Sequence, residues 1–140
     1  MPAHTVFDAL HVAVSPVILI SAYGLLLLSL TNRLGRAIDR ARMLAREPSS
    51  NRGVQIEIIA RRAKWIRSAI LYVAIAIVSA AVLVLVLFLS VFLPVDMKVV
   101  VTALFTLSLL CLIVSLGYFM VDIFGSLKAM EAELDDVNEK

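Results

Sequence analysis

Cysteine occurs only once in this chain of 140 residues, at Cys111, so the sequence can form neither an internal disulfide nor a cysteine metal cluster. Glycine-rich phosphate loops, CxxC pairs, the HExxH zinc motif and Ser-His-Asp or Cys-His catalytic sets are also missing. The sequence therefore contains no visible carrier of catalysis. We expect a protein that is not an enzyme and has no cofactor.

Charged residues are missing from three long stretches, 9–31, 68–93 and 99–121. As a helix, each stretch would span at least roughly 34 Å, whereas the hydrocarbon core of a bilayer is about 30 Å thick. Hydrophobic residues make up 61% of the chain and the mean hydropathy is +0.98, while the apolar share of a soluble domain is about 45–50%. The composition predicts an all-α membrane protein with three transmembrane helices.

Positive charge is concentrated between the first two stretches. Residues 32–67 hold ten of the thirteen Lys and Arg residues, and only Asp39, Glu47 and Glu57 oppose them. Short loops rich in Lys and Arg remain on the cytoplasmic side of a membrane. We therefore expect the N-terminus outside, the segment around Lys98 outside, and the C-terminus in the cytoplasm.

The helical pattern continues beyond the membrane stretches. Apolar residues recur every three or four positions on both sides of a breaker, 47–53, which contains Pro48 and Gly53. This pattern predicts a cytoplasmic helical hairpin over 32–67. Residues 122–140 have coiled-coil spacing and carry six acidic and two basic residues. We expect this C-terminal helix to dock on the basic hairpin, with a solvated acidic tail as the alternative, and the whole chain, 1–140, to form one membrane domain.

Polar or small residues follow one line along each predicted helix, at about 100° per residue. The line on the first helix contains His11, Ser15, Ala22, Ser29, Arg33, Arg36 and Arg40; on the second, Arg61, Lys64, Ser68, Tyr72, Ser79 and Ser90; on the third, Ser108, Cys111, Ser115, Tyr118, Asp122 and Ser126. Such lines turn toward protein or water rather than lipid. They indicate either helix packing or, in a homo-oligomer, a water-lined path along the first helix, where the inner arginines would favour anions or repel cations.

Asp122 ends the third apolar stretch at the level of the arginine-rich segment. Its candidate ion-pair partners are Arg33, Arg36 and Arg67. An ion pair that locks the third helix to the hairpin is favoured over a proton relay.

A second polar group lies near the N-terminus, where His4, Asp8 and His11 follow one another at spacings of four and three. Imidazoles and a carboxylate on one helical face suit a divalent transition metal. A helix that begins near Thr5 and uses Thr5 and Asp8 as a capping box explains the same residues more simply. We therefore expect no metal site.

The first stretch carries a family resemblance. Residues 18–36 read ILISAYGLLLLSLTNRLGR, preceded by Ser15-Pro16 and followed by Asp39-Arg40 and Arg42. This block resembles a bacterial family of small membrane proteins catalogued as a domain of unknown function, and the similarity extends over nearly the whole chain. The resemblance implies a three-helix architecture in the bacterial inner membrane and no established activity. It singles out Ser15, Pro16, Thr31, Asn32, Arg33, Gly35 and Arg36 as a set.

Two functions from different classes fit these patterns. The first is an oligomeric ion channel or transport-like assembly whose pore is lined by the first helix. The alternative is a non-transporting structural or regulatory module that binds partner proteins or anionic lipid through the basic hairpin. Arginines this close to a membrane are attracted to anionic head groups by roughly 1 kcal/mol each. We therefore expect anionic lipid, and not nucleic acid, as the partner of these charges.

Overall fold

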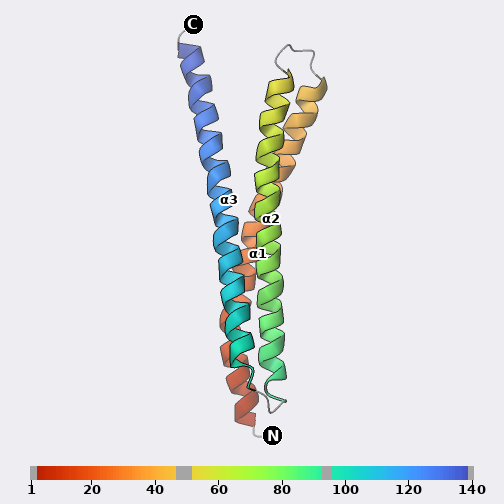
Figure 1. The fold of residues 1–140 in the computed structure, drawn as a ribbon, viewed down its shortest axis with the longest axis vertical. Helices are drawn as coiled ribbons and strands as arrows, with labels where there is room; N and C mark the ends of the chain where they lie inside the picture. The colour runs from red at the N-terminus through yellow and green to blue at the C-terminus, as the bar shows by residue number, and fades with distance from the viewer. Residues whose placement is uncertain (1–2, 47–51, 93–95, 139–140) are drawn as a thin grey trace.

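Three long helices make up the fold. The computed structural model describes the backbone of residues 3–46, 52–92 and 96–138, and the side chains of 7–8, 10–46, 53–92 and 96–127. Within these ranges the elements are α1 (Ala3–Arg46), α2 (Arg52–Leu89) and α3 (Lys98–Asn138). Figure 1 shows α1 and α2 extending together at one end, which we call the arginine-rich end (residues 32–67). The all-α class and the helical extensions predicted from the sequence are confirmed.

Each helix contains a segment that is long and apolar enough to cross a membrane. These segments are Leu10–Arg46, Gly53–Leu89 and Lys98–Leu127. Helices satisfy their own backbone hydrogen bonds, which is why they can cross a bilayer that offers no water. The chain is therefore a multi-pass membrane protein.

Three helix boundaries differ from the sequence-based expectation. Helix α2 begins at Arg52, within the predicted breaker 47–53, so Gly53 belongs to the helix. Helix α1 begins at Ala3, before Thr5. A capping box needs its first residue outside the helix, so the predicted cap formed by Thr5 and Asp8 is wrong; Ala3 has the highest helix propensity and extends the helix. Helix α2 ends at Leu89 rather than at residue 93, because the backbone N–H groups of Val91 and Phe92 bond three residues back, in a tighter turn that does not continue the α-helix.

The connection from α2 to α3 is tightened by short-range hydrogen bonds. The N–H groups of Val91 and Phe92 donate to the carbonyls three residues earlier, at 3.3 and 3.0 Å. Asp96 then accepts a hydrogen bond from the N–H of Lys98 through Oδ1, at 3.2 Å. Helix starts leave backbone N–H groups without partners, and an Asp side chain supplies one.

Helix α2 is the centre of the bundle, since both α1 and α3 pack against it. Its inner face is made of small residues, which allow helices to approach closely where lipid removes the hydrophobic drive for association. The most deeply buried apolar residues are Tyr23, Leu30, Ile66, Ala69, Val73, Ala76 and Ala80. Tyr72 of α2 also stacks on Tyr118 of α3, with ring centroids 5.8 Å apart.

Hydroxyl groups join the three helices inside the bundle. The Oγ of Ser115 donates to the carbonyl of Ala69 at 2.8 Å. The Oγ of Ser108 lies 3.0 Å from the carbonyl oxygen of Ala76 and 3.3 Å from the Oη of Tyr23. Ser108 and Ser115 are buried. The polar line of the third helix is thus used for helix packing.

The C-terminal part of α3 does not lie along the hairpin. Figure 1 shows α3 diverging from α1 and α2 toward its C-terminus. The prediction that the C-terminal helix docks along the length of the hairpin is therefore wrong. Two heptads are too few to hold an independent coiled coil. Among the described side chains, which end at Leu127, Asp122 and Ser126 make hydrogen bonds to the arginines of α1 and α2.

Candidate functional site

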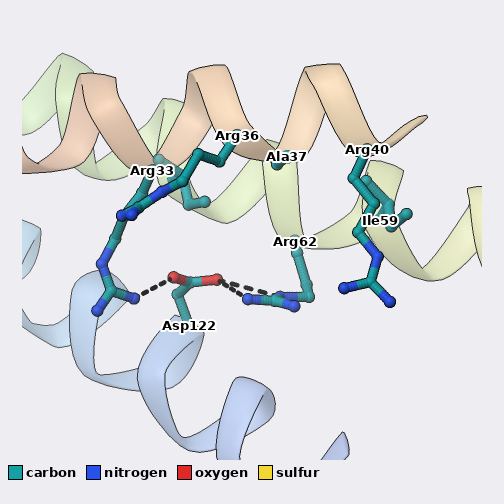
Figure 2. A pocket seen from close by; sticks show the side chains of 8 residues that line it. Arg33, Arg36, Ala37, Arg40, Ile59, Arg62 and Asp122 are labelled. Atoms are coloured by element: carbon teal, nitrogen blue, oxygen red, sulfur yellow. Dashed lines mark hydrogen bonds and ion pairs between the residues drawn. The ribbon is translucent and has the colours of Figure 1, made fainter. Parts of the chain in front are cut away.

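Asp122 lies at the junction of all three helices. Its side chain is 1% exposed, and Oδ2 is 3.1 Å from Nη1 of Arg33 on α1. Its Oδ1 accepts hydrogen bonds from Nε and Nη2 of Arg62 on α2, both at 3.3 Å. Figure 2 shows the carboxylate held between the two guanidinium groups. Hydrogen bonds between ionised groups are stronger than neutral ones, so this cluster, the Asp122 clamp (Arg33, Arg62 and Asp122), ties the three helices together.

Other groups on α3 orient the two arginines. The hydroxyl of Ser126 accepts a hydrogen bond from Nη2 of Arg62 and donates to the backbone carbonyl of Asp122 at 2.9 Å. The guanidinium of Arg33 lies over the ring of Phe119, 4.9 Å from its centroid, which is a cation–π contact. Both arginines are therefore fixed by contacts in addition to the carboxylate.

The structure brings together some of the residues that the sequence suggested. Arg33 contacts Asp122 directly, whereas Arg36 lines a cavity beside it and Arg67 is exposed. Arg62 was missed. A signal for it exists in the sequence, because Arg62 lies four residues before Ile66 and so continues the buried face of α2. Arg67, one residue after Ile66, points about 100° away from that face.

A cavity of about 310 Å³ opens next to the Asp122 clamp. We call it the arginine cavity; its charged lining consists of Arg33, Arg36, Arg40, Arg62 and Asp122. Its apolar wall consists of Ala37, Ile59 and Ile66. Among the described residues, the ion pairs of Asp122 involve Arg33 and Arg62, and Arg36 and Arg40 have no carboxylate within 4.0 Å. Four arginines and one carboxylate thus line the arginine cavity.

The polar line of α1 has a different environment from that of α3. Its members His11, Ser15, Ala22, Ser29, Arg36 and Arg40 are exposed, and Arg33 is turned inward to Asp122. The buried line of the same helix runs through Ala13, Pro16, Tyr23 and Leu30. One residue corresponds to about 100° of rotation, so Ser15, Ala22 and Ser29 point about 100° away from the packed face and lie outside it.

Hydroxyl groups on the outer surface of α1 differ in their hydrogen bonding. Ser21 donates to the carbonyl of Val17 at 3.4 Å, and Thr31 donates to the carbonyl of Leu27, each within its own helix. Within the described part of the chain, Ser29 has no hydrogen-bond partner. It borders an open hollow of about 390 Å³ with Asn32 and Arg36.

Asp8 and His11, at the start of α1, are exposed. The side chain of His4 lies outside the described residues. Among the side chains that the structure describes, no group of three His, Cys, Asp or Glu residues could hold a metal ion.

Comparison with protein families decides the classification. The model of a family described as a protein of unknown function (DUF2721) matches residues 13–132. The chain belongs to this family. The family resemblance found in the first apolar stretch is confirmed. No curated protein and no solved structure matches the chain.

The range matched by the DUF2721 model includes the Asp122 clamp, the arginine cavity and the polar line of α1 from Ser15 onward. Asp8 and His11 precede it. Within the residue set singled out by the resemblance, Arg33 and Arg36 line the arginine cavity, and Asn32 lies at the open hollow. Pro16 is buried within an uninterrupted α1.

Proposed function

We propose that this DUF2721 protein acts as a homo-oligomeric membrane assembly in which the polar line of α1 borders a path for ions. The observation that carries the proposal is the outward position of that line. In α3 the equivalent polar residues, such as Ser108 and Ser115, are buried within the three-helix unit, whereas Ser15 and Ser29 of α1 are exposed.

The energetic reason is the cost of polar groups in hydrocarbon. Moving a hydroxyl or amide from water into an apolar medium without a hydrogen-bond partner costs a free energy on the order of 2–7 kcal/mol. Ser21 avoids this cost by bonding to its own helix, but Ser29 has no such bond within the described residues. Contact with a second copy or with water would supply the missing partner.

The orientation belongs to the same proposal. Placing residues 32–67 in the cytoplasm and the N-terminus outside, in a bacterial inner membrane, follows the distribution of Lys and Arg. The path would then run from Ser15 at the outer side, past Ser29, to Arg36 at the inner side. Rings of arginine in an oligomer would attract anions and repel cations.

Purified protein in liposomes tests the proposal. We expect a chloride flux that Ser29→Leu reduces strongly, because leucine removes the hydroxyl and narrows the path. Ser21→Leu is the matched control: it is the same substitution on the same helix, at an exposed hydroxyl that already bonds within the helix. Particle mass in mild detergent should show four or more copies. A monomer or dimer without flux would contradict the proposal.

The arginine cavity favours a second candidate, a non-transporting module that binds anionic lipid or a partner protein through the arginine-rich end. Such a module predicts no flux from the same liposomes. It also predicts that a lipid or protein is retained through purification.

A further inference from the structure

We infer that the arginine cavity is a binding site for one phosphate group, supplied by the head group of an anionic phospholipid. This inference goes beyond the conduit and does not depend on it, because the cavity lies within a single copy of the chain. It rests on the charge of the lining, on the fixed geometry of two arginines and on the apolar wall.

The charge balance of the cavity calls for an anion. Four arginines and one aspartate line about 310 Å³, so the local charge is strongly positive. The carboxylate of Asp122 is already paired with Arg33 and Arg62. Arg36 and Arg40 have no carboxylate partner within the described residues. Positive charges that line one cavity repel one another, and a phosphate bound there relieves that repulsion.

The geometry fits phosphate better than a simple halide. Guanidinium groups present several N–H donors in a fixed plane and bind phosphate oxygens with two parallel hydrogen bonds. Arg62 uses Nε and Nη2 to bind Asp122 and Ser126. Its Nη1 is thereby oriented in advance, so less side-chain freedom is lost when that group binds a phosphate oxygen. Figure 2 shows Arg40 and Arg62 extending from different helices toward the side where Asp122 lies.

The position of the cavity favours a lipid as the source of the phosphate. Asp122 directly follows the third charge-free stretch, 99–121, so the arginines stand at the level where head groups begin. Ile59 and Ile66 give the cavity an apolar wall suited to the glycerol and upper acyl carbons. Basic pockets between transmembrane helices at this depth are a common form of head-group site.

The test compares two pocket variants with a control in the full chain. Arg40→Gln removes an unpaired charge without touching the Asp122 clamp, and Ala37→Leu fills the cavity without changing any charge. Arg42→Gln is the matched control, because Arg42 is an exposed arginine of α1 outside the cavity lining. Binding is measured as bound phosphatidylglycerol in nanodiscs by native mass spectrometry, and as thermal stabilisation in detergent by phosphatidylglycerol or inorganic phosphate. Protection of Cys111 from a thiol reagent verifies that each variant is folded.

We expect Arg40→Gln to weaken phosphatidylglycerol binding about five-fold, from roughly one arginine–head-group interaction. Ala37→Leu should weaken it at least as much, and Arg42→Gln should bind like the original protein. A response to phosphatidylglycerol alone identifies the lipid as the source. An equal, variant-dependent response to inorganic phosphate supports the site with a free anion as its source. Equal losses in Arg40→Gln and Arg42→Gln, with no effect of Ala37→Leu, would overturn the inference in favour of diffuse surface attraction.

Discussion

Asp122→Asn is the most direct perturbation of this fold, because one side chain holds α3 to both other helices. The substitution keeps the size and one oxygen acceptor of the side chain but removes its charge. Arg33 and Arg62 then lose the carboxylate that lies 3.1 and 3.3 Å from them. We expect the contact of α3 with the hairpin to weaken, while the membrane spans themselves persist.

The size of the expected loss in docking free energy follows from the burial of Asp122, Arg33 and Arg62. Removing one member of a fully buried ion pair costs about 3–5 kcal/mol, because the remaining charge has no compensation. Here Asp122 is 1% exposed, but the side chains of Arg33 and Arg62 are 31% and 33% exposed. Both arginines can turn partly to water or head groups. We therefore expect a loss of about 2 kcal/mol in the free energy of docking α3, or about 30-fold in the docking equilibrium.

Cys111 provides the assay. It is the only cysteine, it lies on α3, and it is 8% exposed. A thiol reagent reaches it when α3 separates from α2, so the labelling rate reports the population of the open form. Asp122→Asn should speed labelling about 30-fold. Glu57→Gln is the control, since the Glu57–Arg61 pair is 3.7 Å long and exposed, and such pairs contribute about 0.3–0.5 kcal/mol.

A double variant separates the loss of charge pairing from other effects of the substitution. Adding Arg62→Gln to Asp122→Asn removes one of the two uncompensated charges, so labelling should slow again toward the original rate. If Asp122→Asn labelled no faster than Glu57→Gln, the carboxylate would not hold α3, and the argument from the Asp122 clamp would be refuted.

Two further predictions concern the packing and the orientation. Ser115→Ala should lower the free energy of unfolding in mixed micelles, because it removes the hydrogen bond from Ser115 to the carbonyl of Ala69 at 2.8 Å. The expected loss is about 0.6 kcal/mol, the average for a hydrogen bond between membrane helices. No change in the unfolding midpoint would show that this bond is not stabilising. Lys98→Cys in a Cys111→Ala background should react with a membrane-impermeant thiol reagent in intact cells. The reason is that the Lys98 side chain is 88% exposed and lies on the side predicted to be external. Labelling only after the cells are opened would show that the chain has the opposite orientation in the membrane.

The helices and their approximate ends could be predicted from local sequence. Three stretches without charge and the breaker around Pro48 and Gly53 are properties of neighbouring residues, and a bilayer demands helix wherever the chain crosses it. The errors were also local. The sequence predicts a cap at Thr5, but α1 begins at Ala3, and it predicts a span up to residue 93, but α2 ends at Leu89.

The candidate site was only partly predictable. Asp122 is predictable because a charge that borders an apolar stretch needs a partner. Of its three candidate partners, Arg33, Arg36 and Arg67, the structure pairs it with Arg33. Arg62 was one of several arginines close together in sequence, and only its position on the buried face of α2 separates it from Arg67. The arginine cavity depends on the distance between helices, which periodicity along one helix does not contain.

The sequence alone determined that this DUF2721 chain consists of three membrane-spanning helices with a basic extension, because hydrophobic length and charge act residue by residue. The tertiary structure decided which polar faces are covered. The lines of α1 and α3 look alike in sequence, yet packing against α2 buries Ser108 and Ser115 and leaves Ser15 and Ser29 outside. A helical pattern defines a face, but only the neighbouring helix decides whether that face meets protein.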